Sequence, residues 1–104
     1  MAVYVDPMMA CVRSRVWPWD EACHLTGDTI GELHAFAAGL GLKRAWFQPS
    51  PPAGLPHYDL TKGKRAQAVK MGAVEIERRE MGERVRAARV AGRAGKDSLF
   101  GQGI

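Results

Sequence analysis

Short apolar runs and helix-like segments alternate along most of the chain. The run AVYV at residues 2–5 ends at Asp6, and its β-branched and aromatic side chains are typical of a buried strand. Two similar runs, RAWFQ at residues 44–48 and AVEI at residues 73–76, predict two further strands.

The segments between these runs have the apolar period of amphipathic helices. GDTIGELHAFAAGLG at residues 27–41 carries one apolar stripe, and Thr29 and Glu32 have the spacing of a capping box. Gly39 or Gly41 is expected to end this helix, and a second helix is predicted over residues 62–71, ended by Gly72. The candidate caps are Asp28 or Thr29 for the first helix, and Thr61 or Asp59 for the second.

This order of elements, β-α-β-α-β, predicts right-handed crossovers and therefore a short parallel sheet. We expect a small three-layer α/β domain over residues 1–77. Residues 78–104 form a basic segment with a thin apolar face and a Glu80/Arg84 pair at i,i+4 spacing. They predict a solvent-facing helix to about residue 91, followed by a frayed tail.

Two segments, residues 7–27 and 49–60, have no clear period. The first contains two prolines, two tryptophans and His24, and the second contains four prolines and His57. A long irregular segment in a compact domain is often functional. Within the first of them we expect at most a short helix or strand around residues 13–17.

Both irregular segments are expected at the edge of the sheet where ligands of open parallel sheets bind, outside the carboxyl ends of the strands. The starts of both predicted helices face the same edge, and their unpaired N–H groups favour an anion. The sequence therefore predicts a site for a small anionic ligand there. The predicted catalytic residues, as general acids and bases, are Asp6, His24, His57 and Asp59, and the predicted ligand-binding residues are Gln48, Tyr58, Lys64 and Arg65.

These residues also have structural interpretations. Asp6 can simply end a strand, His24 can be a hydrogen-bonded core histidine, and Tyr58 can face the core. His34, beside the apolar stripe of the first helix, is more typical of a structural residue, and Asp28 of a helix cap.

The candidate residues carry no recognised cofactor motif. Two histidines with Asp6 or Asp59 are able to bind a transition metal, but no sequence spacing supports such a site, so we predict no metal ligands. Cys11 and Cys23 lack the CxxC spacing of structural zinc and are expected as two reduced thiols. The chain has no P-loop, GxGxxG or G-x-S-x-G motif, and it identifies no cofactor.

The net charge of +4 is unevenly distributed. Residues 1–76 carry eight Lys or Arg and seven Asp or Glu, whereas residues 77–104 carry seven and four. Such a basic tail is able to contact nucleic acid through phosphates, although a solvated surface helix fits it too. No apolar stretch reaches the roughly 20 residues of a membrane span, and MAVYVDP lacks the features of a signal peptide. We therefore expect a cytoplasmic protein with no membrane contact.

Four strings, taken together, resemble the family of small bacterial and phage proteins called domain of unknown function 4031. They are VYVD at 3–6, HLTGDTIGELHAFAAGLGL at 24–42, WFQ at 46–48 and PHYDLTKGKRAQAVKMGAVEI at 56–76. The resemblance covers about residues 2–77 and implies a small standalone α/β protein of bacterial or phage origin, without an assigned activity.

Three interpretations of function stay open. In the first, the protein binds a phosphorylated or nucleotide-like ligand at the carboxyl edge of the sheet, with hydrolysis or transfer at the phosphate as a further step. In the second, it is a non-enzymatic phage or mobile-element protein that contacts nucleic acid or an acidic host protein through residues 78–104. In the third, the polar residues only cap helices and satisfy buried loops.

Overall fold

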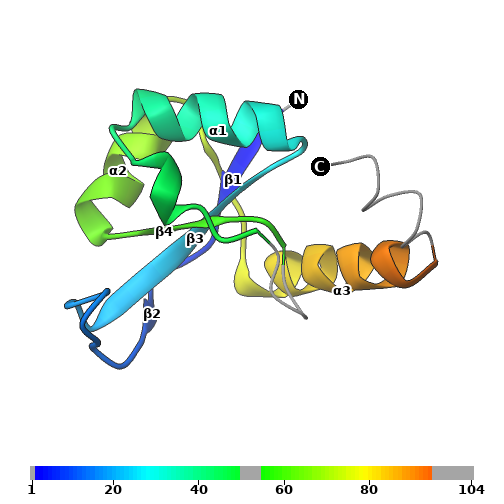
Figure 1. Ribbon diagram of the computed structural model, residues 1–104, viewed down its shortest axis with the longest axis horizontal. Coiled ribbons are helices and arrows are strands. Elements are labelled where there is room, and N and C mark those ends of the chain that lie inside the picture. The colour runs from blue at the N-terminus through cyan, green and yellow to red at the C-terminus, as the bar shows by residue number, and fades with distance from the viewer. Residues whose placement is uncertain (1, 50–54, 95–104) are drawn as a thin grey trace.

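In a computed structural model of the chain, residues 2–49 and 55–94 are described, the last four of them by their backbone alone. One mixed sheet contains β1 (Val3–Val5), β2 (Met9–Ala10), β3 (Glu21–Gly27), β4 (Tyr58–Leu60) and β5 (Val74–Glu75). The helices are α1 (Ile30–Gly39), the short 3₁₀ helix η1 (Arg44–Trp46), α2 (Lys62–Lys70) and α3 (Arg78–Ala94) (Figure 1).

The central strand of the sheet is β3. It pairs antiparallel with β1, with β2 and with β4, while β1 pairs parallel with β5. The α/β class and the parallel pairing of the first and last predicted strands are thus confirmed. The expectation of a parallel sheet throughout is wrong, because β3 returns directly beside β1 without a crossover helix.

The long segment at residues 7–27, predicted to be irregular, contains this central strand. Cys23 and Leu25 are fully buried, and His24 between them is only partly buried, so the strand alternates. The alternation is weak in sequence because His is found both in cores and on surfaces, and because Thr26, a polar residue next to Leu25, is buried as well. Residues 13–17, where we expected any regular structure, form no helix or strand.

Residues 44–48 do not form the predicted second strand. Arg44, Ala45 and Trp46 are all exposed and form η1, whereas a strand of the predicted parallel sheet would be covered on both faces. Only Gln48 takes part in pairing, through an isolated antiparallel bridge with His57.

The core lies between the sheet and the helices α1 and α2, which cover the same face (Figure 1). Thr29 and Thr61 cap these helices by accepting hydrogen bonds from the N–H groups three residues later. Gly41 and Gly72 adopt positive φ angles just after the helices end, as the sequence predicts. The fully buried or nearly buried core residues include Val5, Leu25, Leu33, Leu40, Tyr58, Leu60 and Ala68.

The C-terminal helix α3 packs against the opposite face of the sheet. Met81 is only 5% exposed, and the guanidinium of Arg84 lies 3.8 Å from the ring centroid of Tyr4. Because Tyr4 alternates with the core residues Val3 and Val5, its side chain lies on the face away from α1 and α2. The helix is therefore not wholly solvent-facing. It continues to Ala94, and the predicted frayed tail largely lies outside the described residues.

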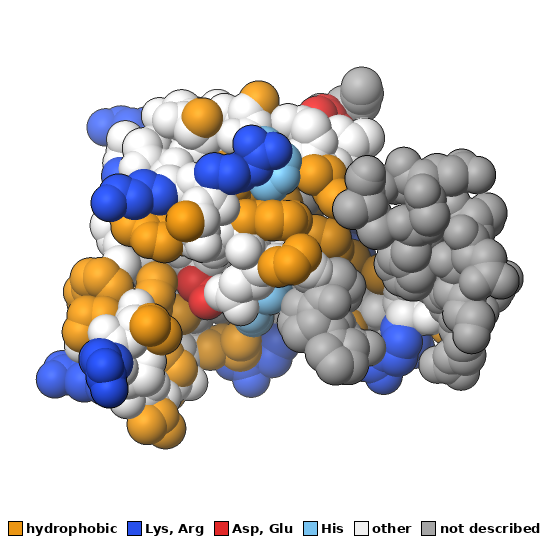
Figure 2. All heavy atoms as spheres, viewed as in Figure 1, with side chains coloured by type: hydrophobic (Ala, Val, Ile, Leu, Met, Phe, Trp, Pro, Cys, Tyr) orange, Lys and Arg blue, Asp and Glu red, His pale blue; other side chains and the backbone are white. Residues whose placement is uncertain are grey.

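Exposed hydrophobic side chains gather at one end of the molecule. In Figure 2 they cover the lower left, where the loop between β2 and β3 lies. Val12 is 90% exposed and Val16 is 88% exposed in this loop.

Candidate functional site

The polar residues of the sheet gather on its α3 face. Strand alternation turns Asp6, His24 and Asp59 to this face, while their neighbours Val5, Cys23, Leu25, Tyr58 and Leu60 point into the core. His24 and Asp59 are direct partners in the antiparallel ladder of β3 and β4, so their side chains lie opposite each other. The site is therefore on a face of the sheet and not at the predicted carboxyl edge. That edge does not exist in the predicted form, because the neighbouring strands run in opposite directions.

Asp6 reaches this face through a bulge in the pairing with β3. Val5 is opposite Leu25, and Met9 is opposite Ala22. Between these two pairs lie three residues on the β1–β2 side, 6–8, and only two on β3, 23–24. Asp6 Oδ1 accepts a hydrogen bond of 2.7 Å from the main-chain N–H of His24. The Asp6 carboxylate thus accepts the hydrogen bond that a main-chain oxygen of the neighbouring strand would otherwise accept from His24.

The same carboxylate orients the His24 ring. Asp6 Oδ2 lies 2.8 Å from His24 Nδ1, and because a carboxylate only accepts, Nδ1 carries the proton. This hydrogen bond raises the pKa of His24 above its ordinary value, against the opposing effect of burial, and the negative charges of Asp6 and Asp59 raise it further. The Asp6 side chain is 2% exposed and that of His24 is 36% exposed, so only the imidazole is accessible.

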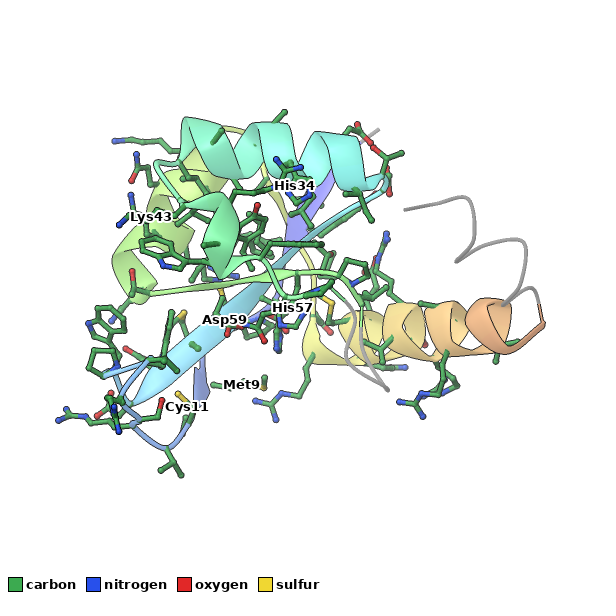
Figure 3. All side chains as sticks on the ribbon, viewed as in Figure 1. Met9, Cys11, His34, Lys43, His57 and Asp59 are labelled. Atoms are coloured by element: carbon green, nitrogen blue, oxygen red, sulfur yellow. The ribbon has the colours of Figure 1, made fainter. Side chains whose placement is uncertain are left out.

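Beside His24 lie His57 and Asp59, next to each other in Figure 3. The His24 and His57 rings meet edge to face with 5.0 Å between centroids, and His57 Nε2 is 3.5 Å from Asp59 Oδ1. Burial raises the pKa of Asp59, but hydrogen bonds from His57 and Gln48 together with nearby positive charge hold it below its ordinary value. Two imidazoles and a carboxylate are ligands that divalent transition metals accept.

Gln48 belongs to this cluster through both its main chain and its side chain. Its N–H and C=O exchange hydrogen bonds of 2.9 and 3.0 Å with His57, and its Nε2 donates to Asp59 Oδ2. The bridge joins the two ends of the proline-rich segment, of which residues 50–54 lie outside the described residues.

Arg65 supports the site by binding the main chain of Asp6. Its Nε donates to the main-chain oxygen of Asp6 at 2.8 Å, and its Nη1 donates to Glu75 Oε1 at 3.1 Å. The side chain is 19% exposed. Arg65 therefore holds the bulge that carries Asp6, and is not placed as a free anion contact.

Lys64 and Tyr58 are not brought into the cluster. Lys64 Nζ donates to the main-chain oxygen of Leu40, at the end of α1. The Tyr58 ring is buried in the core, where its hydroxyl lies 2.8 Å from His34 Nδ1. His34 lies on α1, away from His57 and Asp59 (Figure 3).

Both cysteines are free thiols. Cys23 points into the core below His24, where burial first and the charge of Asp6 second raise its pKa to about 12. It is therefore a neutral packing residue and not a nucleophile.

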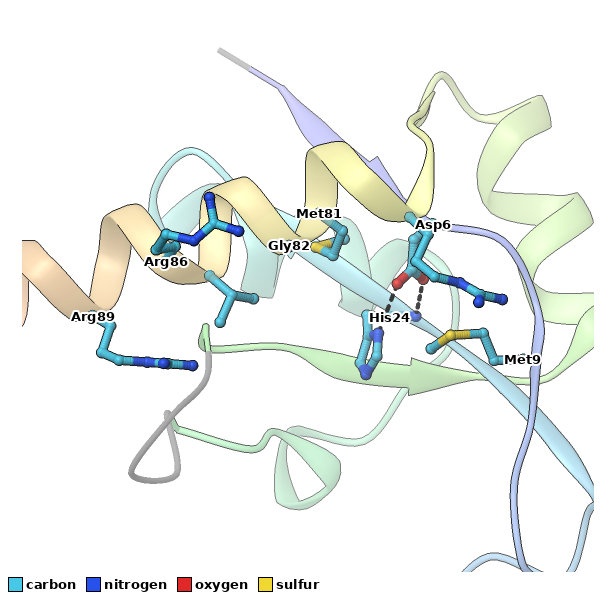
Figure 4. A pocket seen from close by; sticks show the side chains of 9 residues that line it. Asp6, Met9, His24, Met81, Gly82, Arg86 and Arg89 are labelled. Atoms are coloured by element: carbon cyan, nitrogen blue, oxygen red, sulfur yellow. Dashed lines mark hydrogen bonds and ion pairs between the residues drawn. The ribbon is translucent and has the colours of Figure 1, made fainter.

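A pocket of about 390 Å³ opens between this face of the sheet and α3. Asp6, Met9 and His24 form its sheet side, with Met81 and Gly82 of the helix opposite them (Figure 4). The sequence analysis did not identify its three cationic lining residues, Arg78, Arg86 and Arg89. Their helical spacing, shared with Met81, Gly82 and Val85, already put them on one face of α3, but only the packed helix directs that face at His24.

Comparison with protein-family models identifies the family of the chain. Residues 3–88 match the family described as protein of unknown function (DUF4031). The chain belongs to this family. The match reaches beyond the resemblance at residues 2–77 into α3, so the helix that closes the pocket belongs to the family region. No curated protein and no solved structure matches the chain significantly.

None of the helices in the described part of the chain has both the length and the apolar character needed to cross a membrane.

Proposed function

We propose that this member of the DUF4031 family binds the phosphate group of a small ligand, such as a nucleotide or a sugar phosphate, in the pocket between the sheet and α3. Hydrolysis or transfer at that phosphate is the second part of the proposal. The observation that supports it best is the Asp6–His24 pair on the floor of a pocket lined by three arginines.

The charges that face the pocket favour an anion. Both carboxylate oxygens of Asp6 accept hydrogen bonds from His24, and the side chain is 2% exposed, so the carboxylate offers no accessible surface to a ligand in the pocket. The accessible groups are the His24 imidazole, whose pKa is raised, and the guanidinium groups of α3. Arginine offers paired donors that fit phosphate oxygens.

The reaction would take place beside the pocket floor, where His57 and Asp59 adjoin His24. Imidazole and carboxylate side chains are the usual general acids and bases of phosphate ester hydrolysis. Asp6, Gln48 and Arg65 orient these groups through the hydrogen bonds that they make.

Binding is tested by thermal shift with nucleotides, sugar phosphates and inorganic phosphate, since a ligand of the folded state raises the midpoint of unfolding. We expect Arg86→Gln to reduce the shift and the matched variant Arg79→Gln, on the same helix but outside the pocket lining, to keep it. No shift with any phosphate compound would contradict the proposal.

Turnover is tested by release of inorganic phosphate from the compound that gives the largest shift. We expect His57→Ala to abolish release while the midpoint of unfolding of the free protein stays within a few degrees. If the unmodified protein binds a phosphate compound but releases no inorganic phosphate from it, the binding proposal stands and the proposed hydrolysis or transfer is wrong.

Nucleic-acid binding through α3 is the second candidate. The observation in its favour is that Arg78, Arg79, Arg86 and Arg89 are all exposed on this helix. Non-specific binding to phosphates depends steeply on salt and is shared among many cations. Arg79→Gln and Arg86→Gln would then weaken DNA or RNA binding equally, whereas the pocket proposal expects an effect of Arg86→Gln alone.

A further inference from the structure

Three side chains of the candidate site converge on one point. His24, His57 and Asp59 each supply a ligand atom, and these atoms all lie within 4.8 Å of one another. We propose that these three residues bind a divalent transition-metal ion. The inference goes beyond the proposed function, because the ligands would bind the ion whether or not a phosphate occupies the pocket. With the ion bound, His57 and Asp59 would act as its ligands in place of the acid–base role given to them above.

The backbone brings the three residues together on one face. Asp59 is opposite His24 in the β3–β4 ladder, and His57 is two residues before Asp59, so both face the same way as His24. The bridge between Gln48 and His57 extends this pairing and fixes the main chain at His57. The ligands are therefore carried by paired backbone and not by free loops.

Each histidine has its Nδ1 engaged by a neighbour that can only accept. His24 Nδ1 is 2.8 Å from Asp6 Oδ2, and His57 Nδ1 is 2.7 Å from the main-chain oxygen of Leu55. Both Nδ1 atoms therefore carry protons, which leaves the Nε2 atoms as the ligand atoms. Carboxylates and main-chain oxygens hold metal-binding histidines in this way, and they make the imidazole a stronger ligand.

The third ligand is oriented in the same manner. Gln48 Nε2 donates to Asp59 Oδ2, which leaves Oδ1 directed at His57. When His57 carries a second proton on Nε2, that proton faces Asp59 Oδ1 at 3.5 Å, and a bound ion would replace it. In the neutral imidazole, with its proton on Nδ1, His57 Nε2 and Asp59 Oδ1 are both acceptors. A cation between them would satisfy both.

The spacing fits a metal after a small adjustment. Bonds of about 2.0–2.2 Å to nitrogen and oxygen keep any two ligand atoms within about 4.4 Å. Closing from 4.8 Å needs only a slight rotation of partly buried side chains. At His24 the ion would replace the Nε2 proton.

The ligand types select among metals. Two imidazoles and one carboxylate suit zinc, cobalt, iron or manganese, whereas magnesium and calcium prefer oxygen ligands alone. Three protein ligands leave coordination positions open for water or for another oxygen ligand. The α3 pocket borders His24, so a phosphate oxygen there is within reach of an open position.

The test uses the full chain, stripped with a chelator and titrated with Co²⁺ or Zn²⁺ by calorimetry and visible absorption. We expect one ion per chain and cobalt bands without the intense thiolate absorption that Cys11 or Cys23 would produce. His57→Gln and Asp59→Asn should each weaken binding at least 100-fold, and Asp6→Asn by about 10- to 100-fold through the His24 ring.

His34→Gln is the matched control, because His34 is the remaining histidine and lies outside the cluster. It should bind the ion as the unmodified protein does. Unchanged affinity in both His57→Gln and Asp59→Asn, or a thiolate band with cobalt, would overturn the proposal. Circular dichroism of the metal-free variants separates lost ligands from lost folding, and Asp59→Asn decides the question if His57→Gln does not fold.

Discussion

At the scale of single residues, the three histidines differ because their neighbours differ. Asp6 raises the proton affinity of His24, whereas burial and the positive charge of Arg44 lower the pKa of His34. The sequence interpretation of His34 as a structural residue agrees with its hydrogen bond to the buried Tyr58. The sequence separated His24 from His34 by their positions along the chain, and the contacts in the fold explain why their pKa values shift in opposite directions.

The lowered pKa of His34 gives a pH-dependent contribution to stability. An unfolded histidine takes up its proton near pH 6.5, while the folded His34 does so only at lower pH. Its contribution is therefore complete above pH 6.5 and is lost as the pH falls through the lowered pKa. We expect the free energy of unfolding to fall less between pH 7 and pH 5 in His34→Phe than in the unmodified protein. Urea titrations measure this difference, and identical pH profiles would contradict it.

At the scale of elements, the helices follow local rules and the strands do not. Thr29 and Thr61 cap α1 and α2 as the sequence predicts, because capping depends on neighbours within one turn. β3 was missed and residues 44–48 were wrongly predicted as a strand, because pairing depends on partners far along the chain. The position of Lys64 also depends on a partner far along the chain. It was predicted to bind a ligand, and the fold places it at the end of α1.

Lys64 should therefore contribute to stability and not to phosphate binding. Lys64→Met removes the 2.6 Å hydrogen bond to the Leu40 carbonyl at the negative end of the α1 dipole. We expect a loss of about 0.5–1.5 kcal/mol in the free energy of unfolding, measured by urea denaturation. The exposed Lys62 offers the matched control Lys62→Met, which should cost much less. A clear loss of phosphate affinity in Lys64→Met alone would restore its predicted role.

At the scale of the whole molecule, the site depends on how α3 packs on the sheet. Met81 and Arg84 fix the helix there, through burial and through contact with Tyr4 and Asp28. The pocket and its arginines exist only in this arrangement. Charge counting finds an excess of positive charge in residues 77–104, but it does not predict that three of these arginines line the pocket beside His24.

Arg84→Ala should loosen α3 without removing any pocket-lining residue. Loss of the Tyr4 contact and of the ion pairs with Asp28 and Glu80 should lower the free energy of unfolding by about 1 kcal/mol. Amide hydrogen exchange should become faster along α3 than in α1 or α2. The control Arg79→Ala, exposed on the same helix, should leave exchange unchanged. Equal protection of α3 in both variants would show that Arg84 does not hold the helix.

The sequence by itself determined the α/β class, the two capped helices with their glycine stops, the first and last strands, and the resemblance to the family that the chain matches. These features rest on local propensity, short-range capping and matching residue strings. It also singled out Asp6, His24, His57, Asp59 and Gln48, which the fold brings together.

Only the tertiary structure decided where these five residues meet. Antiparallel pairing of β3 with β1 and β4 turned them to one face of the sheet, and α3 then closed a pocket over that face. Register and helix docking come from contacts between distant residues, which no local pattern encodes.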